Sequence, residues 1–293
     1  LREAMVFDAA RLTEVHFDWQ EMVSITLDSR KGFPEQRARK WMDQHFNFFV
    51  QCSIAYFFVI FGIKFFMRNR QPFDLQRPLN YWNAFLAVFS TAGTIFMAPE
   101  FFGILFGKGF RASYCDIGQQ TSGQNGFWQW LFMLSKLAEF TDTIFIVLRK
   151  KPLMFLHWYH HILTLIYGTF SFPVTPAYNR WGIFLNFGVH SFMYSYYMLR
   201  SMNIKIPGAV ARAITTGQIA QFLISIIVLC FRGYEHYALG LNDCTFDLSC
   251  FWLASFMDMT YFILFVNFFL QSYVFGGGKA KYAAVKKDEK KKQ

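Results

Sequence analysis

The sequence predicts an all-α integral membrane protein. Of its 293 residues, 54% are hydrophobic and 21% are aromatic, a composition too apolar for a soluble globular chain. Several stretches approach the roughly 20 apolar residues that a helix needs to span a bilayer. Helices satisfy their own backbone hydrogen bonds in lipid. The formal net charge of +10 is then expected to sort between the two membrane sides, and it does not indicate nucleic-acid binding.

Seven transmembrane helices are expected. In chain order, their predicted ranges are 46–67, 81–106, 127–148, 153–172, 181–199, 209–231 and 251–275. Together they form one membrane domain, 46–275, between a leader, 1–45, and a Lys-rich tail, 276–293. Residues 34–45 of the leader predict a short interfacial helix that begins near Pro34, with a solvated polar segment as the alternative. Because the first residue is Leu1, a preceding segment or a cleaved signal stays open.

Positive charges gather on one set of alternate loops. These loops carry Arg68, Arg70, Arg77, Arg149, Lys150, Lys151, Arg200 and Lys205, and the Lys-rich tail lies on the same side. The opposite loops carry Lys108, Arg111, Arg180 and Arg232. The positive-inside rule therefore predicts a cytosolic C-terminus and a luminal N-terminus. Arg37, Arg39 and Lys40, which precede the first span, count against this orientation.

Two cysteines, Cys115 and Cys244, fall in loops on the predicted non-cytosolic side. An oxidising lumen would permit a disulfide between them. Free thiols are the alternative, because pairing cannot be deduced from sequence.

Polar side chains recur at helical spacing in four of the predicted spans. They are Lys136, Glu139, Asp142 and Thr143; His157, His160, His161 and Thr164; Asn186, His190, Met193 and Tyr197; and Thr215, Gln218 and Gln221. Polar groups within a membrane are costly and usually face an interior cavity. With a rise of 1.5 Å per residue, Asp142, His160, His190 and Gln218 lie roughly 10 to 16 Å from the cytosolic ends of their spans. We therefore expect one buried polar chamber that opens towards the cytosol.

Most of these residues also have a structural interpretation. Lys136 and Glu139 would form an intrahelical ion pair, Gln218 and Gln221 would link helices by hydrogen bonds, and Tyr197 would be an interfacial aromatic. Three imidazoles in one helical turn are harder to explain structurally, because each needs polar partners in hydrocarbon.

The spacing of "HWYHH", residues 157–161, also suits metal ligands, as in the HxxHH boxes of membrane di-iron oxidases and desaturases. The whole chain holds seven histidines, and those in the predicted chamber are too few for two irons. One zinc with three histidines and a water stays an alternative. Without a metal, histidine supplies acid-base catalysis or attacks a thioester to form an acyl-imidazole.

A lipid-chain substrate would suit this chamber. Its polar head would bind at a basic mouth, and its chain would enter a Phe-rich interior. The residues expected at the mouth are Arg149, Lys150, Lys151, Arg200 and Lys205.

Four blocks of the sequence resemble one family closely. "KLAEFTDT" (136–143) is similar to its KxxExxDT block, "HWYHH" to its HxxHH box, "NFGVHSFMYSYY" (186–197) to its NxxxHxxMYxYY block, and "TTGQIAQF" (215–222) to its TxxQxxQ block. In this order they resemble the ELO family of very-long-chain fatty-acid elongases. "LRKKPLMFLHWYHH" looks most like the branch that acts on saturated and monounsaturated acyl-CoAs.

The resemblance implies a fold, a location and a reaction. Six of seven helices would form a closed barrel around a narrow tunnel in the endoplasmic reticulum membrane. An acyl-CoA and malonyl-CoA would give 3-oxoacyl-CoA, carbon dioxide and free CoA, with no permanently bound cofactor. Reductases and a dehydratase of the cycle would be partners, and a homo-oligomer stays open. The ending Lys290-Lys291-Lys292-Gln293 resembles a dilysine retrieval signal.

The resemblance also suggests roles for individual residues. His160 would carry the acyl group, with His190 beside it, and Asp142 would orient a histidine. Donors that stabilise the enolate would be Asn186, His157, His161 or Gln218. The expected substrate-binding set adds Lys136, Glu139, Tyr197 and Gln221. The rival mechanism is a direct ternary reaction with histidine as the base only.

Two other classes of protein remain as alternatives. One is a metal-dependent membrane lipid oxidase or desaturase. The other is a non-enzymatic seven-helix receptor or transporter, since transporters also bury polar groups near the midplane.

Overall fold

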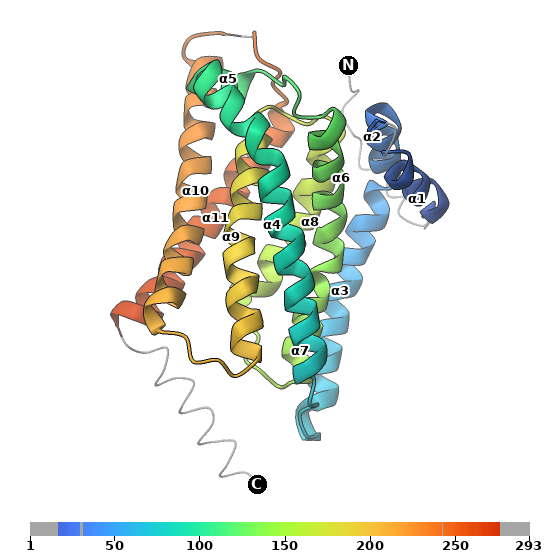
Figure 1. The fold of residues 1–293 in the computed structure, drawn as a ribbon, viewed down its shortest axis with the longest axis vertical. Helices are drawn as coiled ribbons and strands as arrows, with labels where there is room; N and C mark the ends of the chain where they lie inside the picture. Colours follow the sequence, from blue (N-terminus) through green and yellow to red (C-terminus); the bar gives the residue numbers. More distant parts are fainter. Residues whose placement is uncertain (1–16, 30–31, 242, 276–293) are drawn as a thin grey trace.

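The computed structural model describes residues 17–29, 32–241 and 243–275, and within these ranges all the regular elements are helices (Figure 1). The predicted tail, 276–293, and its retrieval signal lie outside the described residues. The helices are α1 (Trp19–Asp28), α2 (Glu35–Gln44), α3 (Phe46–Phe66), η2 (Met67–Asn69), α4 (Gln76–Gly107), α5 (Phe110–Cys115), α6 (Gly123–Ala138), α7 (Phe140–Leu148), α8 (Phe155–Ser171), α9 (Asn179–Ser201), α10 (Gly208–Tyr237), α11 (Leu248–Phe269) and η3 (Leu270–Val274).

Four helical segments of the described chain are long and apolar enough to cross a membrane. They are Phe46–Asn69, Gln76–Gly107, Gly208–Tyr237 and Leu248–Val274, which correspond to four of the seven predicted spans. The other predicted spans correspond to α6 with α7, to α8 and to α9. Helices α6, α7 and α8 are shorter than the four long segments. Together with α9, they carry most of the polar residues of the predicted chamber.

The predicted continuous helix 127–148 is wrong at one point, since α6 ends at Ala138 and α7 begins at Phe140. The Glu139 amide donates to the Ser135 carbonyl (2.8 Å), and the Glu139 carbonyl accepts from the Asp142 amide (3.0 Å). The second bond spans three residues and tightens the turn. The Ser135 hydroxyl also donates to the Glu139 carboxylate (3.1 Å), so Glu139 is held at the break.

The leader contains more structure than predicted. The expected helix at 34–45 is present as α2, and α1 precedes it. Asp18 caps α1 by accepting from the Glu21 amide (2.9 Å), a Ser/Asp-x-x-Glu pattern that marks helix starts. Arg37 of α2 pairs with Glu21 (3.0 Å) and Asp28 (2.7 Å) of α1, which joins the two helices.

The longer helices run lengthwise beside one another, with α5 at one end of the bundle and α7 at the other (Figure 1). The packed pairs are α4 with α9, α9 with α10, α10 with α11, α11 with α8, α8 with α6, and α6 with α4. Helix α3 packs against α7 and α8. Most of the polar residues of α6 to α9 therefore lie in the interior of the bundle.

Candidate active site

The centre of the site is an ion pair between Lys136 and Glu139, both only 3% exposed. The Lys136 ammonium donates to the Glu139 carboxylate (2.8 Å) and to the Asn186 side-chain carbonyl of α9 (3.0 Å). The Asn186 amide nitrogen lies 3.3 Å from His190 Nε2. The ion pair is therefore not confined to one helix, because it connects α6 through Asn186 to a histidine on α9.

The three histidines of α8 lie side by side. Ring centroids are 4.6 Å apart for His157 and His161, and 5.4 Å apart for His160 and His161. His157 Nε2 is hydrogen-bonded to the Thr143 hydroxyl (2.9 Å), which also bonds the Tyr56 hydroxyl of α3 (2.6 Å). Thr143 thus fixes the orientation of the His157 ring.

His160 is positioned by a tyrosine on α11. The Tyr261 hydroxyl donates to the His160 backbone carbonyl (2.9 Å), and the two rings lie 4.9 Å apart. The same hydroxyl shares a hydrogen bond with Thr164 (2.9 Å). Sequence reasoning missed Tyr261, because aromatic residues are too common in this chain to single one out.

The expectation that Asp142 orients a histidine directly is wrong. Its carboxylate accepts from the Tyr194 hydroxyl (2.7 Å) and from the Trp82 indole, and within the described chain it makes no hydrogen bond to a histidine. The Tyr194 ring lies 5.3 Å from the His190 ring. Tyr194 therefore contacts both Asp142 and His190.

A cavity of about 80 Å³ begins at His160 and Asn186. His160, Asn186 and Gln221 contribute to its wall, and its lining extends to Tyr178 and Asn179 near the start of α9. Side chains of α6, α8, α9, α10 and α11 form the wall, and most of it is apolar. The polar centre and an apolar cavity are thus continuous.

Most of the predicted site residues lie outside the cavity lining, which includes His160, Asn186 and Gln221 but not Lys136, Glu139, Asp142, His157, His161, His190, Tyr197 or Gln218. Tyr197 is 47% exposed and packs against Tyr196, so it does not join the buried centre. The Gln218 amide donates to the Met193 sulfur (3.4 Å), which links α10 to α9.

The residues of the predicted basic mouth gather at the α7 end. Lys151, Arg200 and Lys205 are exposed. Arg149 donates to the Gln76 side chain (2.8 Å), and Lys150 donates to the backbone carbonyls of Arg68 and Arg70 (3.3 and 3.1 Å). Three loops that are distant in sequence therefore present cations on one surface.

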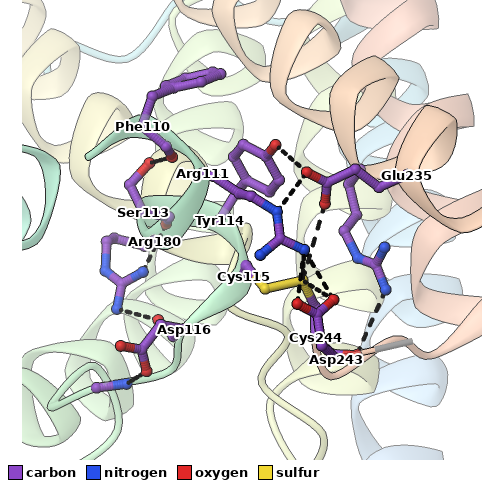
Figure 2. Close-up of a disulfide and its surroundings, with 12 residues drawn as sticks. Phe110, Arg111, Ser113, Tyr114, Cys115, Asp116, Arg180, Glu235, Asp243 and Cys244 are labelled. Atoms are coloured by element: carbon purple, nitrogen blue, oxygen red, sulfur yellow. Dashed lines mark hydrogen bonds and ion pairs between the residues drawn. A yellow bond between two sulfur atoms is a disulfide. The ribbon is translucent and has the colours of Figure 1, made fainter. Parts of the chain in front are cut away.

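The α5 end is closed by a disulfide between Cys115 and Cys244 (Figure 2). Beside it, the Arg111 guanidinium donates to Glu235 and to Asp243 (both 2.8 Å). Its bond to Asp243 lowers the pKa of the Asp243 carboxyl. Figure 2 also shows Tyr114, whose hydroxyl donates to Glu235 (2.8 Å). We call this group the disulfide cap; it consists of Arg111, Tyr114, Cys115, Glu235, Asp243 and Cys244.

The one compact group of potential metal ligands among the described residues is Cys115, Asp243 and Cys244. Its two sulfurs are bonded to each other, so they offer no thiolate. The histidines of α8 and α9 form no such group in the described part of the chain, and the zinc alternative gains no geometric support.

The chain matches known proteins over most of its length. The family model described as "ELO: GNS1/SUR4 family" matches residues 41–281. "Long chain fatty acid elongase 1" of Caenorhabditis elegans is 58% identical over 277 residues, which cover 94% of this chain and 96% of the relative. "Very long chain fatty acid elongase 6" is 42% identical over 257 residues in Drosophila melanogaster, covering 87% of this chain and 81% of the relative. The human protein of that name is 37% identical over 246 residues, covering 83% and 91%.

The matched family range includes all of the buried polar centre, the cavity wall, the basic surface and the disulfide cap. With a family model that spans most of the chain and relatives that are aligned over most of their own length, the chain belongs to the ELO family.

Proposed function

We propose that this chain, a condensing enzyme of fatty-acid elongation, joins an acyl-CoA to malonyl-CoA in the cavity that begins at His160, with loss of carbon dioxide. The observation that carries this proposal is the continuity of the buried centre with an apolar cavity. A thioester carbon could react beside His160 and Asn186, while its hydrocarbon chain lies in the cavity away from water. The product is a 3-oxoacyl-CoA two carbons longer than the starting chain.

The fold is proposed to be a closed barrel of six transmembrane passes. The succession of packed pairs runs from α4 through α9, α10, α11, α8 and α6 back to α4, which supports closure. Helices α6 and α7 together would make one pass, and α3 would lie outside the barrel. The cavity would be the acyl tunnel.

In the proposed covalent mechanism, a His160 imidazole nitrogen attacks the acyl-CoA carbonyl carbon. The carbon–sulfur bond breaks, and the CoA thiolate leaves as a thiol with the proton that the acylated imidazole of His160 releases. Malonyl-CoA then loses carbon dioxide, and the electron pair stays on its C2 as an enolate. That carbon attacks the acyl carbonyl, and the carbon–nitrogen bond to His160 breaks.

The neighbouring groups would stabilise the charge that develops. In this scheme Lys136 transfers no proton and acts by orienting Asn186. Its bond to Asn186 orients the Asn186 amide, whose N–H groups can donate to an enolate oxygen beside His190. Such preorganised donors are most effective in a buried site that excludes water.

The exposed cations at the α7 end would bind the phosphates of CoA. Lys151, Arg200 and Lys205 offer point charges and donors that suit phosphate oxygens. This assignment makes the α7 end cytosolic, in the endoplasmic reticulum membrane. A reductase must remove the 3-oxo group of the product before dehydration and a second reduction complete the cycle.

The test is to incubate purified protein with labelled malonyl-CoA and a panel of acyl-CoAs, and to resolve products by mass spectrometry. Wild-type protein and the control H236A should form 3-oxoacyl-CoA, since His236 stacks on Phe246 away from the cavity wall. H160A should not. If the wild-type protein formed no ketoacyl product with any acyl-CoA, the proposal would be contradicted.

The covalent step has its own readout. With acyl-CoA alone, the intact mass of the wild-type protein should rise by one acyl group, and that of H160A should not. Product formation without this adduct would favour the ternary mechanism.

A further inference from the structure

Besides His160 and Tyr178, three polar side chains in the cavity wall make no hydrogen bond to any residue that the structure describes. They are Gln221 and Ser225 of α10 and Asp258 of α11, which are 6%, 7% and 8% exposed. Gln221 and Ser225 are four residues apart and share one face of α10, and α10 packs against α11. The three therefore form one polar wall of the cavity, which we call the α10–α11 polar wall.

Four other polar residues of the cavity wall are paired with each other. The Tyr167 hydroxyl donates to Asn179, and Thr164 bonds the Tyr261 hydroxyl. Burial of a polar group without a hydrogen-bond partner costs free energy, so such groups normally face a ligand or water. The α10–α11 polar wall thus indicates a polar group at a depth where an acyl chain would otherwise present only methylenes.

The chemistry of the polar wall restricts what that group can be. An amide offers donors and an acceptor, a hydroxyl offers both, and a carboxyl group accepts and, when protonated, also donates. The lining that the structure describes contains no lysine or arginine, so nothing in it would balance the charge of a phosphate or carboxylate, and burial without a counter-charge favours the neutral form of Asp258. A hydroxyl group fits, because it can donate to Asp258 and accept from Gln221 or Ser225.

We propose that Gln221, Ser225 and Asp258 bind a hydroxyl group carried by the acyl chain, so that the enzyme favours hydroxylated acyl-CoAs. The inference rests on the proposed role of this cavity as the acyl tunnel. Asp258 is three residues from Tyr261, or about 4.5 Å along the helix axis, and the Tyr261 ring contacts His160. The hydroxyl therefore lies only a few carbons beyond the reacting carbonyl.

The test compares pairs of acyl-CoAs of equal length, one plain and one hydroxylated, with the hydroxyl moved one carbon at a time from the thioester. The quantity measured is the ratio of kcat/KM for the hydroxylated chain to that for the plain chain. In wild-type protein this ratio should peak at one position. S225A and D258L should each lower the peak about tenfold, the effect of one lost hydrogen bond.

M257L is the matched control, because Met257 lines the same cavity without a polar group to lose. It should keep the wild-type ratio. D258N preserves the shape of Asp258 and covers the case in which D258L does not fold; it should lower the peak less than D258L. A flat ratio in wild-type protein, or a peak unchanged by S225A and D258N, would overturn the proposal and leave water as the occupant.

A binding measurement separates this proposal from condensation itself. Without malonyl-CoA, the hydroxylated chain should raise the unfolding temperature of wild-type protein more than the plain chain does, and S225A should lose the difference. If this holds while no ketoacyl product forms, the proposed reaction fails and the hydroxyl site stands. Equal shifts in wild-type protein would overturn the site whatever the turnover.

Discussion

At the scale of single residues, Lys136 and Glu139 show how the protein keeps charge in its interior. Each is almost fully buried, and each neutralises the other. A buried pair of this kind adds little net stability, but removal of one partner leaves an uncompensated charge. We therefore expect K136M and E139Q to lower the free energy of unfolding by about 3–5 kcal/mol each.

The double variant K136M/E139Q should be less destabilised than the sum of the two single variants, because it buries no lone charge. Denaturant unfolding in detergent measures all three, and the coupling follows from the double-mutant cycle. Additive losses would mean that the two side chains act independently.

Tyr194 contacts both Asp142 and His190, so we expect it to transmit the effect of Asp142 to this histidine, and the substitution Y194F tests this. The phenylalanine ring keeps its place beside His190 but donates no hydrogen bond to the Asp142 carboxylate. A bond to a charged group contributes roughly 1.5–3 kcal/mol, so kcat/KM should fall about tenfold or more. Y234F, at an exposed position of α10, is the control. If D142N abolished activity while Y194F retained all of it, the indirect route would be wrong.

At the scale of elements, the disulfide cap joins α5 to the segment between α10 and α11. The bond closes a loop of 129 residues, and removal of such a bond costs about 2–5 kcal/mol through the entropy of the unfolded chain. The double variant C115S/C244S should unfold at a lower temperature than wild-type protein. A reducing agent should destabilise wild-type protein and C230S equally, since Cys230 is a free cysteine, and should not affect the double variant.

The ion pair in the same cap predicts how stability depends on pH. Arg111 lowers the pKa of the Asp243 carboxyl from its usual 3.8, so the folded state binds that proton less readily than the unfolded state. The stabilisation is present above about 3.8 and is lost as the pH falls through the lower folded value. D243N should unfold at a lower temperature than wild-type protein near neutrality, and the difference should shrink below pH 4. A constant difference across this range would contradict the assignment.

Sequence patterns predicted the positions of the helices better than they predicted the contacts between helices. Long apolar runs determine α3, α4, α10 and α11, because length and composition suffice for a membrane span. The break at Glu139 was not predictable, since it depends on Ser135 and on local hydrogen bonds within an otherwise helical segment. Spacing grouped the histidines, but Trp82 and Tyr261 come from spans that carry no polar stripe. Their roles depend on which helices pack together, and periodicity within one helix does not report that.

At the scale of the whole molecule, the two ends of the bundle differ in the burial and ion pairing of their cationic side chains. At the α5 end, Arg180 is fully buried and pairs with Glu100 (2.8 Å), and Arg111 pairs within the disulfide cap. Arg37, which counted against the predicted orientation, is paired with Glu21 and Asp28. The exposed, unpaired cations of the described loops are those at the α7 end, among them Lys151 and Lys205, whereas Lys40 of α2, at the other end, is an exposed cation without an ion pair to any described residue. This asymmetry and the disulfide support the proposed orientation, with a cytosolic α7 end and a luminal α5 end.

Cysteine labelling tests this orientation directly. In a C52S/C230S background, Met202 and Gln119 are replaced singly by cysteine, since both are exposed, one in the α9–α10 loop and one in the α5–α6 loop. In sealed microsomes whose cytosolic face is outside, a membrane-impermeant maleimide should label M202C at once. Q119C should be labelled only after detergent opens the vesicles, and the background protein should stay unlabelled because its remaining thiol, Cys250, is buried. The reverse pattern would place the basic surface in the lumen, away from cytosolic CoA substrates, and labelling of both positions in sealed vesicles would mean that the bundle does not separate its two ends across the bilayer.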